Sequence, residues 1–448
     1  LTSVASVTFN VAQFGSERYN AKMFRALILI AVLWLVQVAC AGEFFVSTNG
    51  SDVATGLSRS NAWATIQHAV DNITTGDIVT VTEGAYAGFR AHVTATADAP
   101  IIVRADVGAS VVLNTEGAQN VHHCIVDIAT KTGSTIAYWT IEGFEVANSS
   151  VHGIGIYGLE QVPIHHITVR SNVVHDSAYT GIFTGFTDDL LIENNRCYLN
   201  GEHGIYCSNS GDRPVVRANR CSTNTSSGIQ FNGDLSIGGD GTISDVVVDS
   251  NVLYGNGSTG GAAINLDGVD GGDVINNLIV NQHATGIALF QGNGAIATRN
   301  VRVIHNTVLT AGGGRWAIDI ADASGVSNTV LNNILYTDHT WRGSISAAFS
   351  AIQGLVCDYN IVMDRFSIDG GSTRITFDEW QALGYDRHSF IASPVGIFAD
   401  AGADDYHLTE SSPGVDDGQA APPVSDDIES TPRVYGCSPD IGAYEWIP

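Results

Sequence analysis

The chain has 448 residues, a formal net charge of −26, 49 glycines and two methionines. So large an excess of acidic residues excludes a nucleic-acid partner, because binding to phosphates requires clustered Lys and Arg. The many glycines indicate a protein rich in turns, and the acidic surface favours solubility and bound cations.

The N-terminal stretch has the features of a targeting segment. Residues 1–22 precede the first Met and are interpreted as upstream residues that are not native to the protein. Residues 23–41 combine one basic residue, Arg25, with a short apolar run and a cleavage signal of small residues, which is the pattern of a secretory signal peptide. We therefore expect a secreted protein, extracellular or periplasmic, that is not attached to a membrane after cleavage.

A short amphipathic helix is predicted near the start of the mature chain. Apolar residues recur there at helical spacing, and a polar residue that could cap the helix precedes them. The apolar positions and the two candidate caps are Trp63, Ile66, Val70 and Ile73, with Ser60 or Asn61. We expect this helix to cover the open end of the fold, because exposed strand edges pair with other chains.

One short pattern then recurs eight times: an apolar residue, two residues, Asn, one residue and an apolar residue. The recurring asparagines are Asn172, Asn195, Asn219, Asn251, Asn277, Asn306, Asn333 and Asn360. Gly143 stands where this series would begin one repeat earlier. The asparagines are 23 to 32 residues apart, a period that indicates stacked supersecondary units rather than one compact globule.

The residues around these asparagines favour strands over helices. The apolar positions on both sides hold small or β-branched residues, as buried strand positions do. Four repeats continue with Gly-Ile nine residues after the Asn: Gly181-Ile182, Gly204-Ile205, Gly228-Ile229 and Gly286-Ile287. We predict an all-β parallel β-helix of about ten coils with three strands each, in which each Asn side chain bonds to backbone and to the Asn of the next coil.

The repeat resembles the right-handed parallel β-helix proteins of the pectate-lyase-like superfamily, over roughly Phe44 to Tyr444. The resemblance implies a parallel β-helix with its N-terminal cap over residues 42–371. It also implies a C-terminal capping segment over residues 372–448, where SPGVDDG resembles a run found in secreted members. It does not imply one activity, because this fold hosts lyases, hydrolases, epimerases and binding proteins.

In this superfamily the substrate groove follows one sheet, which by strand order corresponds here to the Gly-Ile strands. Side chains alternate along a strand, so the residues that face solvent can be predicted. The predicted substrate-binding residues in these outward columns are Tyr157, Phe183, Gln230, Asn232, Asn265 and Asp319. Aromatic rings stack on pyranose faces and amides bind hydroxyl groups, so we expect a polysaccharide as the partner.

Titratable residues concentrate in and beside the turns that enter these strands. The predicted catalytic residues are His203, Tyr206, Glu202, His152 and Tyr179, with His203 and Tyr206 at the centre. A His can remove a proton, a Tyr can donate one, and a carboxylate can orient the His.

Carboxylates also crowd the turn that leaves the strand and the coil that follows it. Asp234, Asp267 and Asp270 are interleaved with glycines and backbone carbonyls, a composition that suits Ca²⁺. We therefore predict a calcium site at these three residues. The spacing is not that of an EF-hand, because no Glu closes a loop of 12 residues.

Two cysteines fall in one inward column of the predicted helix. Cys197 and Cys221 follow successive ladder asparagines by two residues. Adjacent strands lie about 4.8 Å apart, which is within reach of a disulfide and also of two stacked thiols. The sequence leaves both alternatives open.

The sequence is compatible with several functions. A monomeric lyase that cleaves a uronic-acid polysaccharide by β-elimination is favoured, because proton-transfer groups and a candidate cation site occur together. A glycoside hydrolase would use paired carboxylates such as Asp234 and Asp267. A uronate epimerase would share the proton chemistry of the lyase, and a non-catalytic glycan-binding protein would need none of it.

Overall fold

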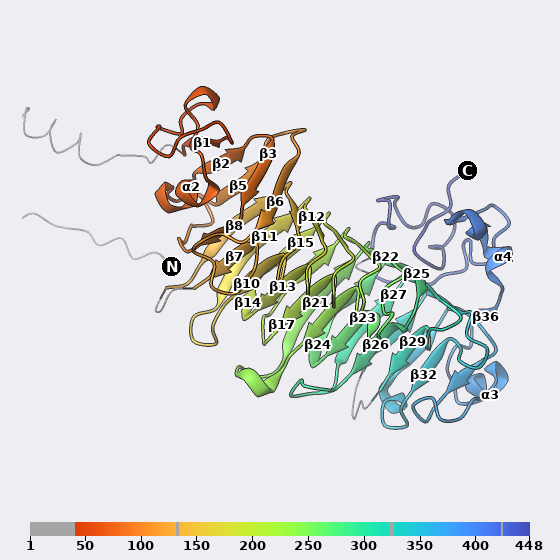
Figure 1. The fold of residues 1–448 in the computed structure, drawn as a ribbon. Helices are drawn as coiled ribbons and strands as arrows, with labels where there is room; N and C mark the ends of the chain where they lie inside the picture. The colour runs from red at the N-terminus through yellow and green to blue at the C-terminus, as the bar shows by residue number, and fades with distance from the viewer. Residues whose placement is uncertain (1–40, 131–133, 322–326, 423) are drawn as a thin grey trace, which may run out of the picture. The chain divides into compact units, whose positions relative to one another are not determined.

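The structure, a computed structural model, describes residues 41–130, 134–321, 327–422 and 424–448. The predicted upstream residues, and the predicted signal peptide up to residue 40, lie outside the described residues. From residue 41 onward the chain winds into a parallel β-helix of about 11 coils, close to the predicted ten (Figure 1). The predicted all-β fold with three strands per coil is confirmed.

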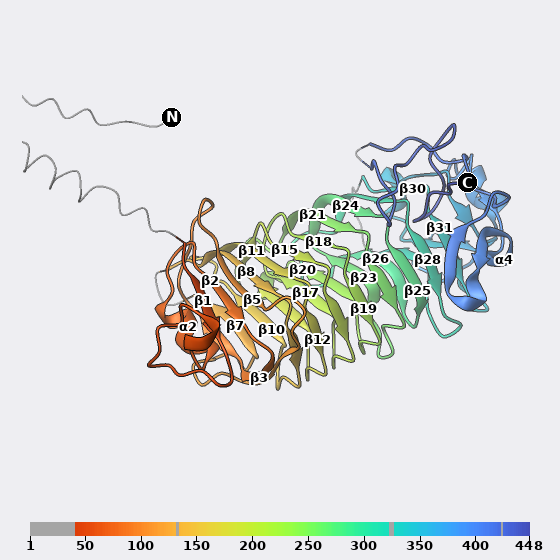
Figure 2. The same cartoon turned by 90° about the horizontal axis from the view of Figure 1, so that it is seen from above.

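Each coil contributes one strand to each of three sheets, here called A, B and C, and neighbouring coils pair in parallel (Figure 2). Sheet A comprises β1 (Glu43–Val46), β2 (Ile78–Val81), β5 (Ile101–Ala105), β8 (Ala137–Glu142), β11 (Ile164–Arg170), β15 (Leu191–Glu193), β18 (Val215–Arg217), β21 (Ile243–Asp249), β24 (Val269–Ile275), β27 (Arg299–Ile304), β30 (Thr329–Leu331) and β33 (Val356–Asp358), with β14 (Thr187–Asp188) beside β11.

Sheet B comprises β3 (Gly84–Ala87), β6 (Val111–Thr115), β9 (Glu145–Ala147), β12 (Val173–His175), β16 (Arg196–Tyr198), β19 (Arg220–Ser222), β22 (Val252–Tyr254), β25 (Leu278–Gln282), β28 (Thr307–Thr310), β31 (Ile334–Thr337), β34 (Ile361–Val362) and β36 (Phe390–Ile391). Sheet C comprises β4 (Phe89–Ala91), β7 (Val126–Ala129), β10 (Ile154–Tyr157), β13 (Ile182–Gly185), β17 (Ile205–Ser208), β20 (Ile229–Asn232), β23 (Ala262–Asp267), β26 (Thr285–Phe290), β29 (Ile318–Ile320), β32 (Ile345–Ala347) and β35 (Phe366–Ser367).

Short helices and one hairpin complete the described chain. The α-helices are α2 (Ile66–Asn72), α3 (Phe377–Ala382) and α4 (Pro394–Ile397). The 3₁₀ turns are η1 (Arg59–Asn61), η2 (Leu235–Ile237), η3 (Ile352–Gly354) and η4 (Ala401–Ala403), and the antiparallel hairpin is β37 (Phe398–Asp400) with β38 (Asp405–Leu408). None of the helices in the described ranges has the length and apolar character needed to cross a bilayer.

The predicted asparagine ladder occupies the turn between sheets A and B. The backbone N–H of each ladder Asn from Asn172 to Asn333 donates to the Oδ1 of the Asn one coil on, at 2.8–3.0 Å. Its Nδ2 donates to the same oxygen at 2.9–3.1 Å. All eight side chains are buried, so the ladder satisfies backbone groups that would otherwise lack partners.

The residue before each ladder Asn adopts a left-handed conformation, with φ of 53–57°. This single residue turns the chain from sheet A into sheet B. Gly143 takes the left-handed position of its own coil, with φ of 81°, so Phe144 rather than Gly143 stands in the ladder column. The Phe144 N–H donates to Asn172 Oδ1 at 3.0 Å and so begins the ladder.

A second ladder, which the sequence analysis did not identify, lies at the turn between sheets B and C. Asn200 donates from Nδ2 to Asn224 Oδ1 at 2.9 Å, and Asn224 does the same to Asn256 at 2.9 Å. All three side chains are buried. One stacked amide column therefore holds the turns between sheets A and B, and a second holds turns between sheets B and C.

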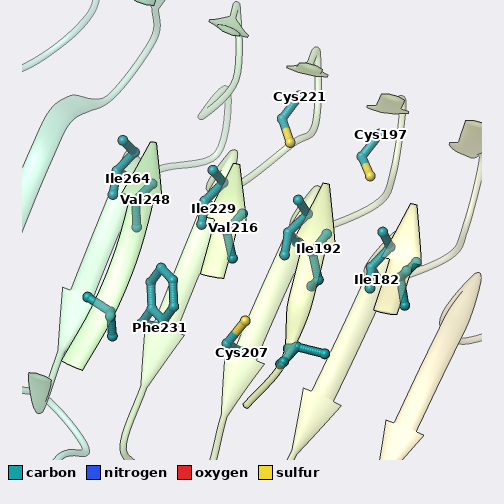
Figure 3. Packing of buried hydrophobic residues seen from close by; sticks show 14 of the residues in the cluster. Ile182, Ile192, Cys197, Cys207, Val216, Cys221, Ile229, Phe231, Val248 and Ile264 are labelled. Carbon is teal, nitrogen blue, oxygen red and sulfur yellow. The ribbon is translucent and has the colours of Figure 1, made fainter. Parts of the chain in front are cut away.

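The interior of the coils is apolar. Figure 3 shows buried residues of adjacent coils side by side, including Ile182, Val216 and Ile229. Cys197 and Cys221 pair in register in sheet B, and both are free thiols in the structure. Coil thus stacks on coil through side chains of similar shape, which is how a solenoid buries its core.

The N-terminal helix is shorter than predicted and has a different cap. Helix α2 begins after Thr65, whose side chain accepts a hydrogen bond from the His68 N–H, so neither Ser60 nor Asn61 is the cap. Trp63 precedes the helix and stacks on Phe44 at 4.8 Å between ring centroids. The reason is that Trp63 pairs with β1 and extends the sheet instead of starting the helix.

The C-terminal residues contact the last coils and complete the ladder. Asn360 donates from Nδ2 to Asp386 Oδ1 at 2.9 Å, and its backbone N–H donates to Ser389 Oγ at 2.7 Å. Asp386 thereby replaces the missing Asn of a next coil. The division of the chain between residues 371 and 372 stays a prediction.

Candidate active site on sheet C

The outward columns of sheet C have the register that the sequence predicts. Phe183 pairs with Gly155 on one side and Tyr206 on the other, and Gln230, Asn265 and Asp319 continue the same line. The second column runs in parallel to it and contains Tyr157, Gly185, Ser208, Asn232 and Asp267. All six predicted substrate-binding residues therefore lie in these two columns.

Aromatic and imidazole rings form a continuous row across three strands of this face. Phe183 is central: the His152 ring stacks on it at 4.6 Å with 8° between planes. Tyr157 lies 5.2 Å from Phe183, and Tyr206 meets it edge-on at 5.4 Å. His203 in turn contacts Tyr206 edge-on at 5.0 Å. We call these five side chains the sheet C strip.

The two imidazoles of the strip are held in the same way. The Thr180 backbone N–H donates to Nδ1 of His152 at 3.2 Å, and the Ser227 N–H donates to Nδ1 of His203 at 3.2 Å. Burial lowers the pKa of each imidazole to about 4. Both rings are therefore neutral near pH 7, because a desolvated cation is disfavoured.

The remaining predicted catalytic residues lie around this pair. The Asn232 amide donates to the Tyr206 hydroxyl at 2.9 Å, and burial raises the pKa of Tyr206. Tyr179 is 47% exposed and lies edge-on to His152 at 6.2 Å between centroids. Glu202 adjoins His203 in sequence, and the His203 Nδ1 atom accepts the Ser227 N–H from the next coil.

A second polar cluster, absent from the sequence prediction, lies beside the N-terminal end of the strip. Asp127 on β7 pairs with Gly155, so it belongs to the same outward column. Its side chain is completely buried, and its Oδ1 lies 2.9 Å from His122 Nδ1. The His122 ring stacks on Tyr157 at 3.9 Å with 17° between planes. Tyr157 therefore joins this cluster to the strip.

The alternation Val126-Asp127-Ile128 was the signal that could have revealed this cluster. It matches Ile154-Gly155-Ile156 in the next coil, with apolar residues inward and the middle residue outward. The predicted columns begin one coil later, because the early coils lack the ladder Asn that sets the register.

The three predicted calcium ligands have separate partners. Asp267 accepts backbone N–H groups from the loop at 292–294 at 2.7–3.1 Å. Asp270 on sheet A binds Arg299 at 2.6 Å and Asn300 at 2.7 Å, while Asp234 accepts from the Ser236 N–H. Within the described ranges no three His, Cys, Asp or Glu side chains form a group that could hold a metal. Calcium binding stays a prediction, and no step below uses a metal ion.

Two clefts lie away from the strip. One, of about 460 Å³, is lined by residues of α2 and by Tyr86 and Gln119. The other, of about 260 Å³, lies between sheet B and the C-terminal residues and is lined by Tyr254, Tyr336 and Tyr406. The candidate site is therefore assigned from its chemistry and not from the depth of a cavity.

Comparison with known proteins agrees with this architecture. Residues 110–259 match a sequence family described as the right-handed β-helix region. The structure of pectate lyase Pel9A superposes with a TM-score of 0.61 at 16% identity, covering 90% of this chain and 96% of that chain. The protein is thus a right-handed parallel β-helix protein with a pectate-lyase-like fold.

Two other solved structures overlap less well. An alginate lyase from Paenibacillus sp. str. FPU-7 has a TM-score of 0.39 at 16% identity, covering 63% of this chain and 94% of that chain. The A-module of the Azotobacter vinelandii mannuronan C-5 epimerase AlgE6 has a TM-score of 0.43 at 15% identity, covering 73% and 93%. No curated protein sequence matches the chain.

Proposed function

We propose that this protein is a secreted lyase that binds a uronic-acid polysaccharide on sheet C and cleaves it by β-elimination. The observation that carries the proposal is the sheet C strip, which brings imidazoles, phenols and an aromatic platform together on one solvent face. Elimination needs three things: stabilisation of the substrate carboxylate, removal of the C5 proton, and protonation of the leaving oxygen.

Binding of the sugar is supported by the rings and amides of the two columns. Phe183 and Tyr157 offer faces on which pyranose rings can stack. Asn265 Nδ2 donates to Gln230 Oε1 at 2.5 Å, and Gln230 is itself buried, so Gln230 positions the Asn265 amide rather than binding sugar. Preorganised amides bind hydroxyl and carboxylate groups at little cost in side-chain entropy.

Charge stabilisation is supported by the neutral imidazoles. A backbone N–H can only donate, so Nδ1 of His152 and of His203 must be the unprotonated nitrogen. Each ring then carries its proton on Nε2 and can donate it as a hydrogen bond to a carboxylate. Tyr206 accepts from Asn232, which leaves its own hydroxyl proton available to a substrate oxygen.

The hydrolase alternative is weaker, because its predicted carboxylates are committed elsewhere. Asp267 is 2% exposed and holds three backbone N–H groups, so it is not placed to act on a glycosidic bond. An epimerase would use the same face as the lyase, and its product, an inverted uronate, would distinguish it.

The test is a panel of acidic and neutral polysaccharides read in two ways. We expect the absorbance of unsaturated uronates to rise with an acidic polymer, because only elimination creates that double bond. New reducing ends without this absorbance would indicate a hydrolase instead. The absence of both signals across the panel would contradict catalysis and favour glycan binding.

Variants test whether sheet C carries the activity. His203→Ala and Tyr206→Phe should each lower kcat/KM by about 10–10², because each removes a hydrogen-bond donor to the bound acidic polymer. His175 and Tyr198 stack on each other at 4.8 Å on sheet B and provide matched controls. Equal losses in His175→Ala and Tyr198→Phe, or none in the sheet C variants, would move the site elsewhere.

A further inference from the structure

We infer that His122, oriented by Asp127, is the proton acceptor of the sheet C face, and that His152 and His203 act only as hydrogen-bond donors. This inference rests on the proposed elimination reaction, which requires a base. It assigns His122 a role opposite to that of His152 and His203, and it follows from the partner that each Nδ1 atom has.

The partner of His122 is a carboxylate. Asp127 has a completely buried side chain, and its two oxygens have separate partners: Oδ1 lies 2.9 Å from His122 Nδ1, and Oδ2 accepts the Val121 N–H at 2.9 Å. An ionised carboxylate can only accept, so the His122 proton sits on Nδ1. The lone pair of a neutral His122 is then on Nε2, which can accept a proton from the substrate.

The partners of the other two imidazoles are backbone N–H groups, which impose the opposite tautomer. Nδ1 of His152 and of His203 accepts a hydrogen bond, so Nε2 carries the proton and has no lone pair to offer. Burial also lowers the pKa of both rings, which keeps them from taking a second proton near neutral pH. Neither ring can therefore serve as the base without first breaking its hydrogen bond to the backbone.

The position of His122 suits contact with a bound sugar. Its side chain is 34% exposed, while Asp127 beneath it is not exposed at all. Because the ring lies flat against Tyr157, a pyranose that stacks on the strip beside Tyr157 would meet the His122 edge. Asp127 and Tyr206 lie in the same outward column but three strands apart, roughly 14 Å, so one sugar ring cannot contact both.

Among the residues that the structure describes, few titratable groups surround His122. Asp127 and Tyr157 contact its ring, and Cys124 follows it with Sγ 3.4 Å from the Tyr157 hydroxyl. Burial raises the pKa of Cys124 to about 12 and also raises the pKa of Tyr157, so both stay protonated near neutral pH. Glu116 binds His123 at 3.3 Å, and the neutral His152 lies next along the strip. Asp127 is thus the anion that fixes His122.

The chemical step then balances with groups already present. His122 Nε2 takes the C5 proton of the uronate, and the C–H electron pair forms the C4–C5 double bond. The C4–O bond breaks, and the departing oxygen takes the Tyr157 hydroxyl proton. The His122 cation returns its proton to the Tyr157 phenolate directly or through solvent.

His203 and Tyr206 bind sugar residues further along the polysaccharide.

The first test measures tautomers and needs no activity. In the full-length protein with ¹⁵N-labelled His, long-range ¹H–¹⁵N spectra distinguish a protonated Nδ1 from a protonated Nε2. We expect His122 as the Nδ1–H form and both His152 and His203 as Nε2–H forms, assigned by single His→Gln variants. A His122 ring protonated on Nε2, or a His203 ring protonated on Nδ1, would overturn the inference even if the protein is an active lyase.

The second test separates chemistry from binding. His122→Ala should lower kcat by about 10²–10⁴ with little change in KM, as loss of a general base does. His203→Ala should act mainly by raising KM, and His175→Ala should change neither. Full kcat in folded His122→Ala would reject the inference while leaving the lyase proposal intact. If no polymer is cleaved, the lyase proposal fails and the spectra alone decide the tautomers.

The third test addresses Asp127 as a positioning residue. In Asp127→Asn the His122 ring should no longer be held in the Nδ1–H form, because an amide can donate as well as accept, and kcat should fall without a matching rise in KM. A purely structural role would reduce the amount of folded enzyme without changing the His122 tautomer. A folded Asp127→Asn variant with an unchanged Nδ1–H signal and full kcat would contradict the assignment.

Discussion

At the scale of single residues, the desolvation of His203 links the candidate site to the stability of the fold. Its pKa falls from the usual 6.5 to about 4 because the ring is buried, and its Nδ1 is held by the Ser227 N–H. The unfolded chain therefore binds a proton between these two values that the folded chain does not bind. By linkage, folding stability is lost as the pH falls through this window and is regained above it.

The predicted consequence is a pH-dependent difference between the wild type and His203→Gln. From pH 7 to pH 5 the wild type should lose on the order of 2 kcal/mol more unfolding free energy than the variant. Chemical denaturation at the two pH values, followed by circular dichroism, measures both losses. Because carboxylates titrate in both proteins, only the difference counts, and equal losses would mean that His203 is not desolvated.

Ala218 adopts a left-handed backbone conformation that is unfavourable for a residue with a side chain. It is exposed and has φ of 53°, a conformation that costs an L-residue roughly 1–2 kcal/mol and a glycine almost nothing. Gly143 occupies the same position in an earlier coil without such a cost. The other coils place Ser, Asn, His or Tyr there, and stacking of the ladder fixes the conformation whatever the side chain.

Ala218→Gly is therefore expected to raise the unfolding free energy by about 0.5–1 kcal/mol, although most Ala→Gly changes are destabilising. Ala85→Gly, at an exposed strand position with ordinary φ, is the matched control and should lower it. Urea denaturation of both variants checks the sign. A stability loss in Ala218→Gly comparable to that in the control would show that the turn is not strained.

At the scale of the elements, the ladder joins sheets A and B by bonds that run along the solenoid. Asn219 receives two hydrogen bonds at Oδ1 from Asn195, and its own Nδ2 donates to Asn251 Oδ1 and to the Ile192 carbonyl. All of these atoms are buried, so a missing partner cannot be replaced by bulk water.

Asn219→Ala should consequently be among the more damaging single changes. It leaves two buried donors of Asn195 unpaired, and each such group costs about 1–3 kcal/mol. Asn49→Ala, at an exposed residue of the N-terminal region, should change stability by less than about 0.5 kcal/mol. Thermal or urea unfolding compares them, and similar midpoints for the two variants would refute a stabilising ladder.

At the scale of the whole described molecule, Asp386 connects the C-terminal residues to the end of the ladder. Its Oδ1 accepts from Asn360, and its Oδ2 accepts from Trp380 Nε1 at 2.6 Å. Burial raises the pKa of this carboxyl. Each solenoid coil contacts mainly its neighbours. Loss of the Asp386 contacts should therefore destabilise the last coils more than the coils of the sheet C strip.

Asp386→Ala is predicted to make the C-terminal region sensitive to protease while the central coils stay protected. Limited proteolysis with mass spectrometry should find early cuts after residue 360 and none between residues 150 and 300. Asp417→Ala, at an exposed residue of the same segment, is the control and should resist like the wild type. Uniform cleavage along the chain would instead indicate that the described residues unfold as one unit.

The repeat by itself determined the architecture. Every regular coil passes the same turn, so the eight ladder asparagines and the apolar columns beside them could be identified without a structure. Strand alternation then gave the outward columns, and Phe183, Tyr206 and Gln230 pair as that alternation predicts. These features depend only on residues close together in sequence, which is why a periodic pattern reveals them.

The roles of the titratable groups depended on the tertiary structure. Which nitrogen of His203 is free depends on Ser227, 24 residues later and one coil further along. The Asp127–His122 pair lies in an early coil that lacks the ladder Asn, so the columns predicted from the sequence do not include it. Asp267 and Asp270 are close in sequence but have different partners, because β23 and β24 lie in different sheets. Periodicity fixes where a backbone position lies, whereas stacking and loop packing decide the partner that its side chain finds.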